Sequence, residues 1–187
     1  MKGHIKMIRF FNTSADCKPE LHYMVDLSDR LSQIKHMVDA GQYFTINRAR
    51  QYGKTTILQA LDAFLKADYV VINIDFQMLS ASKFRNENAF SIAFAKKFLK
   101  TAESNKALDS SVLSQLKTAL EENREELELP ELFEYLSDFC ASSPYPVVLL
   151  IDEVDSAANN QVFLDFLAQL RGYYIGRTTV PTFQSVI

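Results

Sequence analysis

Residues 47–56, NRARQYGKTT, decide the fold of this chain. The stretch ends in Gly53, Lys54 and Thr55, as a phosphate-binding loop does. The full pattern G-x-x-x-x-G-K-[ST] has glycine at its first position, where this chain has Arg48. That position lies at the junction of strand and loop, so it tolerates another residue whose backbone keeps φ negative. The departure weakens the motif without removing its chemistry.

The segments on either side give the loop the setting that it requires. Residues 43–47 read as a short strand, and residues 55–66 read as a helix with a continuous apolar face. Strand, loop and helix in this order form the unit in which the motif occurs. At the start of such a helix, unpaired N–H groups and the positive end of the helix dipole converge and attract phosphate. The stretch therefore predicts a nucleotide site.

Each residue type in the loop suits one part of that chemistry. Gly53 lets the backbone approach the phosphates, and Lys54 is long enough to contact the β and γ phosphates. Thr55 is predicted to bind Mg²⁺ through its hydroxyl, and the N–H of Thr56 to bind phosphate. The arginines of the loop either contact phosphate or form surface ion pairs. The expected cofactor-binding residues are Arg50, Gln51, Tyr52, Gly53, Lys54, Thr55 and Thr56.

A second motif, PVVLLIDEVD at residues 146–155, places two carboxylates at the end of a predicted strand. Its five consecutive apolar residues are typical of a strand that is buried on both faces. Asp152 follows them, at the C-terminal end where parallel sheets bind ligands, and is predicted to hold Mg²⁺ through water. Glu153 is predicted to orient and deprotonate the attacking water, so Glu153 and Lys54 are the expected catalytic residues. The alternative for this acid pair is a strand end that reaches solvent, and the loop in the same chain argues against it.

The rest of the chain alternates predicted strands and helices. Residues 69–76 read as a second strand, because they are rich in β-branched and aromatic residues. Residues 178–187 look like the start of a fourth strand. Helical periodicity predicts helices at residues 87–102, 110–122 and 161–174, and one that Pro130 opens. This alternation predicts an α/β fold with a parallel sheet flanked by helices.

We expect one phosphate-binding-loop domain over residues 1–187, with a sheet that is incomplete at the C-terminal end. Its expected parts are a lead-in and helix at 1–42, the loop unit and second strand at 43–76, a helical insertion at 77–145, and the acidic strand, its helix and the start of a further strand at 146–187.

The composition agrees with this interpretation. The chain has 187 residues, of which 48% are hydrophobic and 23% are charged, as in a globular domain with one sizeable core. A formal net charge of -3 gives no broad basic surface for nucleic acid. Cys17 and Cys140 share no metal-ligand spacing with each other or with the histidines, which suits reduced thiols. No apolar run has the length of a signal peptide or a membrane span, so we expect a cytoplasmic protein without a membrane partner.

At the loop and the acid pair, the chain resembles the AAA-ATPase-like family of bacterial P-loop proteins. Members of that family carry an Arg-x-Arg-x-x-Gly-Lys-[Ser/Thr] loop, and this chain has RARQYGKT at residues 48–55. The resemblance runs from about residue 11 to the end and includes HYMVDLSDRL at 22–31 and VVLLIDEVDS at 147–156. It implies an additional-strand ATPase, in which the strand after the Walker B helix is inserted beside the first strand and carries a polar sensor. The chain stops before any such sensor.

The resemblance also implies that residues 1–187 are the N-terminal ATPase portion of a longer protein with a nuclease-like C-terminal domain. The function expected first is ATP binding with Mg²⁺-dependent hydrolysis in the intact protein, with little turnover by this portion alone. ATP is preferred to GTP because a guanine-reading Asn/Thr-Lys-x-Asp motif is not evident. The alternative is a nucleotide-gated switch with little turnover, coupled to a partner, a nuclease domain or DNA. A third interpretation is a nuclease-associated motor or defence protein, and assembly into an oligomer stays open.

Other residues stay open between two interpretations. Residues 22–24 either contact adenine or, the favoured alternative, pack in the core or lead into the first helix. Asp75 either lines the cleft or forms a turn. Arg171 and Arg177 are fingers for a neighbouring subunit if the protein assembles, and solvated side chains otherwise. The acidic run at 121–128 is interpreted as a solvated helix face or linker.

Overall fold

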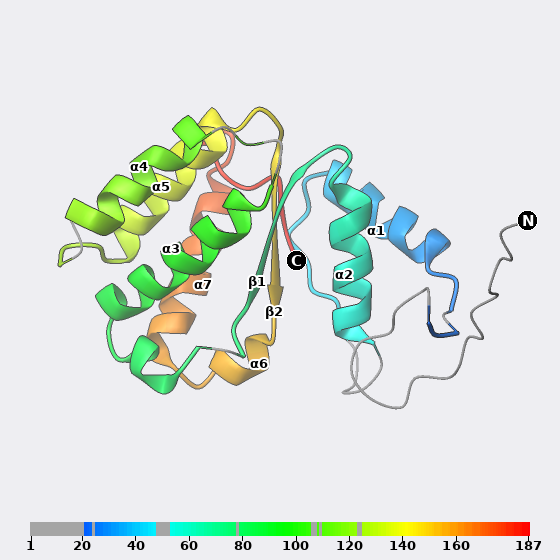
Figure 1. Cartoon of the computed structure of the whole chain (residues 1–187), viewed down its shortest axis with the longest axis horizontal. Helices are drawn as coiled ribbons and strands as arrows, with labels where there is room; N and C mark the ends of the chain where they lie inside the picture. Colours follow the sequence, from blue (N-terminus) through cyan, green and yellow to red (C-terminus); the bar gives the residue numbers. More distant parts are fainter. Residues whose placement is uncertain are drawn as a thin grey trace, which may run out of the picture.

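The computed structural model of this chain describes residues 21–23, 25–47, 53–77, 79–105, 108, 110–122 and 125–187. Within these residues, a parallel sheet has the order β1 (Val70–Asp75), β2 (Val147–Asp152) and β3 (Ser185–Val186) (Figure 1). Helices flank both faces of the sheet, so the predicted α/β fold is confirmed. All six residues of β2 are buried, as expected for a strand covered on both faces.

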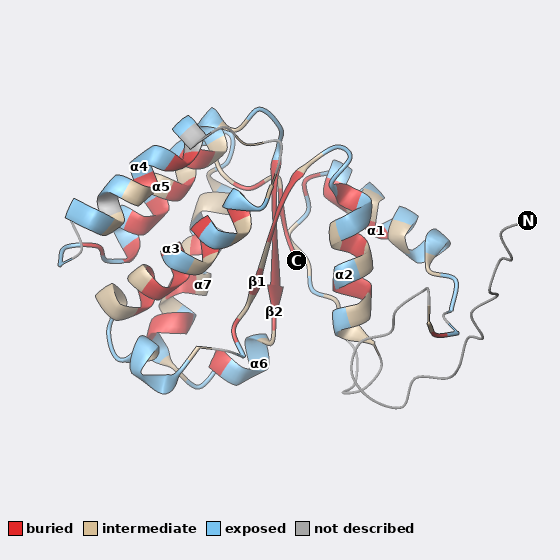
Figure 2. Ribbon diagram, viewed as in Figure 1, coloured by how far each residue is buried: buried red, intermediate tan, exposed pale blue. Residues whose placement is uncertain are grey.

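Alternating residues of the strands face two different helical layers. Val71, Val148 and Leu150 pack with α1 (Ser28–Asp39) and α2 (Lys54–Leu65). The residues of β1 and β2 that alternate with these point to the opposite face of the sheet, where they pack into a larger core (Figure 2). That core contains the helices α3 (Glu87–Glu103), α4 (Ser110–Glu122), α5 (Leu129–Ser142) and α7 (Gln161–Ile175).

The predicted helical insertion is present as α3, α4 and α5, preceded by the short helix η1 (Ala81–Phe84). Asn86 caps α3 because its side chain accepts the N–H of Ala89 at 2.8 Å. A reciprocal capping box of Glu128 and Glu131 begins α5. The phenylalanines of the insertion and of α7 meet around Phe76, which follows β1: its ring contacts those of Phe90, Phe94, Phe163 and Phe166. The insertion is therefore part of the main core.

Of two predicted strands, one is absent from the structure and the other is shorter than expected. Residues 43–47 form no strand: Tyr43 makes one parallel bridge with Val186, and the N–H of Phe44 donates to the carbonyl of Val186 at 3.1 Å. Of residues 178–187, only β3 pairs as a strand. The chain before β3 first completes a turn after α7 and then passes Pro181, which has no N–H for a ladder. Because β3 is so short, the segment 43–47 has little edge to pair with.

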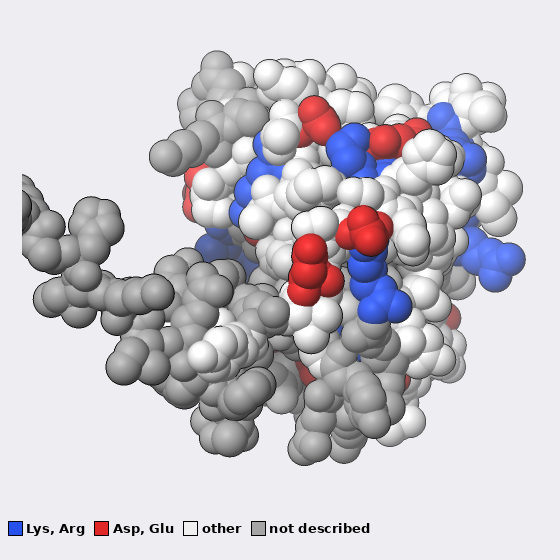
Figure 3. All heavy atoms as spheres, turned by 90° about the vertical axis from the view of Figure 1, so that its right-hand side faces the viewer, with Lys and Arg blue, Asp and Glu red and all other residues white. Residues whose placement is uncertain are grey.

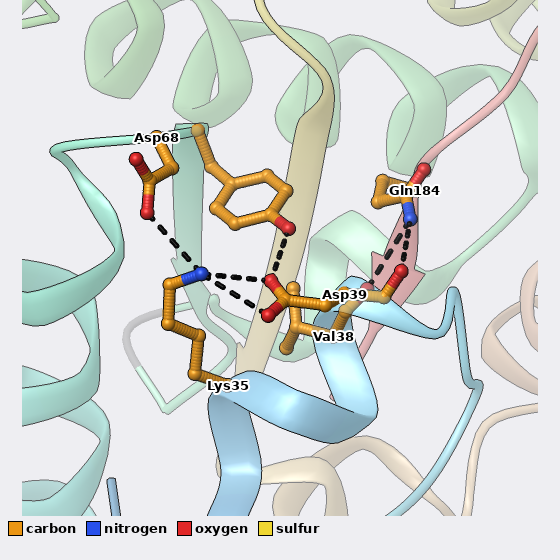
Figure 4. A network of polar contacts seen from close by, with 6 residues as sticks. Lys35, Val38, Asp39, Asp68 and Gln184 are labelled. Carbon is orange, nitrogen blue, oxygen red and sulfur yellow. Dashed lines mark hydrogen bonds and ion pairs between the residues drawn. The ribbon is translucent and has the colours of Figure 1, made fainter. Parts of the chain in front are cut away.

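The end of α1 is hydrogen-bonded to the segment around β3. Gly41 adopts a φ of 64°, and its carbonyl accepts the hydroxyl of Tyr174 at 2.6 Å. The side-chain amide of Gln184 donates to the carbonyls of Val38 at 3.2 Å and Asp39 at 3.4 Å (Figure 4). These bonds fix the path of the chain between α1 and the phosphate-binding loop.

A polar network joins α1 to the turn between α2 and β1 (Figure 4). The Nζ of Lys35 lies 2.9 Å from Oδ1 of Asp39 and 3.2 Å from Oδ2 of Asp68. The hydroxyl of Tyr69 donates to Asp39 at 2.6 Å. Burial, together with this bond to a carboxylate, raises the pKa of Tyr69 to about 12. Positive and negative side chains lie next to one another on the face formed by α1 and α2 (Figure 3).

Across the described residues, the helices are all too short or too polar to cross a lipid bilayer.

Candidate functional site

A cavity of about 300 Å³ lies between the start of α2 and the C-terminal end of β2. It is lined by residues 45–47, by Lys54 and Leu58 of α2, by residues 151–155, and by Ile187. Ligands of open parallel sheets bind at this edge, beyond the carboxyl ends of the strands. The two sequence motifs therefore meet in one cavity, although they are far apart in the chain.

Gly53 and Lys54 form the described end of the phosphate-binding loop. Gly53 has φ 73° and ψ 32°, a left-handed conformation, and precedes the first residue of α2. Among the described residues, a Cβ at this position would meet only the Cβ of Thr56, at 4.0 Å, and the left-handed conformation itself favours glycine. The side chain of Lys54 lines the cavity, and its Nζ lies 3.9 Å from Oδ2 of Asp155.

The two threonines after Lys54 are placed differently from that lysine. The side chain of Thr55 is exposed and that of Thr56 is half-buried, and neither residue lines the cavity. The structure thus places Lys54 at the cavity, and Mg²⁺ binding by the hydroxyl of Thr55 stays a prediction. The predicted contacts of Arg50, Gln51 and Tyr52, and those of Arg48, fall on residues outside the described ranges.

Asp152 ends β2 and faces the cavity. Its side chain is buried, with 9% of the residue exposed, and its Oδ1 accepts the N–H of Glu153 at 2.9 Å. No three acidic, histidine or cysteine side chains of the described residues gather to hold a metal. Mg²⁺ is commonly held by one or two carboxylates together with phosphate oxygens and water. Asp152 is the residue of this cavity that fits such a role.

Glu153 lines the cavity in an unusual backbone conformation. It has φ 58° and ψ 37° and is the one non-glycine residue with positive φ in the described part of the chain. This left-handed turn redirects the chain from β2 into α6 (Val154–Ala157). Such a conformation costs about 1–3 kcal/mol and is concentrated at functional sites. The sequence carries no signal for it, because glutamate has no preference for the left-handed region.

The structure adds residues to the site that the sequence did not indicate. Asp155 lines the cavity opposite Lys54, three residues after Asp152 in the same acidic stretch, and that spacing was the available signal. Ile187 reaches the site because its N–H donates to the carbonyl of Leu149 and its carbonyl accepts the N–H of Ile151. Thr45, Ile46 and Asn47 line the other wall.

The structure gives the positions of three residues for which the sequence left two interpretations open. Asp75 is a turn residue: its Oδ1 accepts the N–H of Gln77 at 2.7 Å, and it does not line the cavity. His22 is buried and does not line the cavity, as expected for core packing. The guanidinium of Arg177 lies 4.1 Å from the ring centroid of Tyr174 and donates to that residue's carbonyl, so Arg177 contacts the end of α7, the helix that precedes it.

Comparison with known proteins assigns the family. The model of the AAA-like domain matches residues 22–186, which include the elements that build the cavity. Searches of curated proteins and of solved structures gave no match. Membership implies a nucleotide-binding domain of the ATPase type. Because the match covers most of the chain, this protein belongs to the AAA-like domain family.

Proposed function

We propose that this chain binds ATP with Mg²⁺ in the cavity between α2 and β2, and that the intact protein hydrolyses the bond between the β and γ phosphates. One observation carries the proposal. Lys54, which begins α2 after the left-handed Gly53, lines the same cavity as Asp152 and Glu153 at the end of β2. A cation at a helix start, facing two carboxylates at a strand end, is the arrangement that phosphoryl transfer requires.

The strand order supports the additional-strand type of ATPase. β3 pairs with β2 on one side and bridges to Tyr43 on the other. The strand that follows α7 therefore lies between the acidic strand and the segment that leads into the phosphate-binding loop. This is the insertion that the family resemblance implies.

In the proposed reaction, the N–H groups at the start of α2 and the ammonium of Lys54 bind the β and γ phosphates. A bound Mg²⁺ would supply positive charge to neutralise the charge that develops on the phosphate oxygens. Asp152 is the carboxylate that would hold it. The carboxylate of Glu153 orients a water molecule and accepts its proton while the water oxygen attacks the γ phosphorus. The bond to the bridging oxygen breaks, and ADP and phosphate leave.

Calorimetric titration with ATP tests the site. We expect Lys54→Ala to abolish ATP binding, because the phosphates lose their cation, and Glu153→Gln to bind ATP normally but to release no phosphate. Lys66→Ala is the matched control, because Lys66 follows α2 at its other end and pairs with Asp62 there. Equal ATP affinity of the wild type and Lys54→Ala would contradict the site.

A second candidate is a nucleotide-gated switch that binds ATP and turns it over slowly. Its support is that Thr55, one of the two predicted Mg²⁺ ligands, is exposed and is not among the described residues that line the cavity. Coupling to DNA or to a nuclease-like domain would then be the output. Phosphate release by the full-length protein, measured with Mg²⁺ and with or without DNA, separates the two candidates: release supports the ATPase, and ATP binding without release in either condition supports the switch.

A further inference from the structure

The ion pair between Lys54 and Asp155 crosses the cavity from α2 to α6. The Nζ of Lys54 and the Oδ2 of Asp155 are 3.9 Å apart, and the two side chains are 27% and 79% exposed. Within the described residues, the ion pairs of Lys54 do not include Asp152 or Glu153, although both line the same cavity. The ammonium expected to bind phosphate is therefore paired with a third acid.

The backbone around Asp155 is fixed by the turn that carries it. The hydroxyl of Ser156 donates to the carbonyl of Glu153 at 2.7 Å, and the N–H of Ala158 donates to the carbonyl of Val154 at 3.1 Å. Ala157 is fully buried in the main core. Because α6 is anchored on both sides of Asp155, the backbone of this residue is fixed within reach of Lys54.

We propose that Asp155 is a positioning residue that holds Lys54 in the nucleotide-free site and competes with the phosphate chain for its ammonium. This inference rests on the proposed function, since it takes Lys54 as the phosphate-binding residue. When the β and γ phosphates enter, the ammonium exchanges the carboxylate oxygen for phosphate oxygens, and no covalent bond changes. Asp155 thereby lowers the affinity for nucleotides whose phosphates reach Lys54.

The exposure of the pair sets the size of the effect. An exposed ion pair contributes at most about 1 kcal/mol, which corresponds to roughly a fivefold change in affinity. We therefore expect Asp155→Asn to bind ATP and ADP about two- to fivefold more tightly than the wild type. AMP should bind with unchanged affinity, because the lysine of such a loop reaches the β and γ phosphates and not the α phosphate.

The experiment is calorimetric titration of the full chain with ATP and ADP, and titration with AMP followed by NMR. Asp138→Asn is the control: it makes the same change of charge at an exposed position of α5, in the helical layer on the other face of the sheet from α2. Asp155→Glu should bind like the wild type, because it keeps the carboxylate. Raising the salt concentration should reduce the difference in ATP affinity between the wild type and Asp155→Asn, since salt screens exposed charges.

Each outcome decides the inference. Tighter ATP and ADP binding by Asp155→Asn alone, with AMP unchanged, supports it. Equal or weaker ATP binding by that variant overturns it, and so does an equal gain for AMP, which would show a general charge effect. In those cases the proposed function still stands if Lys54→Ala loses ATP binding. A wild type that binds no nucleotide overturns both the inference and the proposed function.

Circular dichroism checks the fold of the variants. If Asp155→Asn does not fold, Asp155→Ser, which is expected to behave in the same way, takes its place.

Discussion

Asp75 and Asp152 lie directly opposite each other in the register of β1 and β2, yet only Asp152 faces the cavity. Both end their strands at the same edge of the sheet, and each carboxylate accepts a nearby backbone N–H. The carboxylate of Asp75 closes the turn to Gln77, whereas Asp152 is buried beside Glu153. Two equivalent positions of the sheet therefore have different roles.

This pair gives a matched test of magnesium binding. We expect Asp152→Asn to weaken Mg²⁺ binding in the presence of ATP by roughly 10–100-fold, because the neutral amide holds a metal-bound water less strongly. Asp75→Asn should leave Mg²⁺ binding unchanged, since the amide oxygen still accepts the N–H of Gln77. Magnesium titration at a fixed ATP concentration measures both. An equal loss of Mg²⁺ affinity in the two variants would contradict the assignment of Asp152 as the residue that holds the metal.

The backbone of Glu153 predicts a difference in stability between two variants. At a φ of 58°, glycine is unstrained and alanine is not, so we expect Glu153→Gly to be about 1 kcal/mol more stable to unfolding than Glu153→Ala. Both variants should lack turnover, because both lose the carboxylate. Urea unfolding measures the stability, and identical midpoints would argue against a left-handed Glu153.

Gly41 and Gly172 predict opposite effects of the same substitution. Gly41 has a φ of 64°, and a Cβ there would lie 3.3 Å from the carbonyl oxygen of Gln184, so Gly41→Ala should destabilise the fold by about 1–2 kcal/mol. Gly172 lies in α7, and the described part of the chain has nothing within 4 Å of an added Cβ there, so Gly172→Ala should stabilise the fold by about 0.5–1 kcal/mol. Urea unfolding of both variants checks the signs. If Gly41→Ala is also stabilising, the contact between α1 and the segment before β3 is less tight than described.

The bond between Tyr69 and Asp39 predicts a pH-dependent contribution to stability. The Tyr69 hydroxyl and then Lys35 lower the pKa of Asp39 below its ordinary value of 3.8, so this stability is present above 3.8 and is lost as the pH falls through the lowered pKa. The pKa of Tyr69 is raised from 10.0 to about 12. The contribution of Tyr69 to the stability of the fold is therefore present below pH 10 and is lost between pH 10 and about 12.

Tyr69→Phe removes this bond. Because both groups are partly exposed, we expect it to lower the free energy of unfolding at pH 7 by less than about 1 kcal/mol. The difference between Tyr69→Phe and the wild type in the free energy of unfolding should shrink at acidic pH, where Asp39 is protonated, and at alkaline pH, where Tyr69 ionises. Urea unfolding as a function of pH measures it, with Tyr145→Phe as the control at an exposed tyrosine. A difference that does not change with pH would show that packing of the ring, and not the hydrogen bond, is lost.

Much of the fold follows from local patterns in the sequence. The apolar periodicity of residues 87–102 and 161–174 predicted α3 and α7 to within a residue, because a helix that buries one face repeats its apolar residues every three or four positions. The five apolar residues before Asp152 predicted a fully buried strand. These features are properties of neighbouring residues, so the sequence contains them.

Contacts between distant segments were decided by the tertiary structure. Residues 43–47 have the composition of a strand, but how much of them pairs depends on the length of β3. The sequence placed Lys54 and Asp152 at a common site and assigned no partner to Asp155, because the ion pair depends on how α6 leaves β2. That direction is set by the left-handed backbone of Glu153, which its side-chain type does not favour.

By itself, then, the sequence determined the α/β class, the order of the elements and the residue types of the candidate site. Periodicity specifies which face of each segment is buried, and a motif specifies which atoms can bind phosphate or metal. Neither specifies which distant segment a face will meet or the sign of φ at a turn. The tertiary structure alone decided that Asp155 faces Lys54, because this pairing depends on how α2 and α6 are packed against β2.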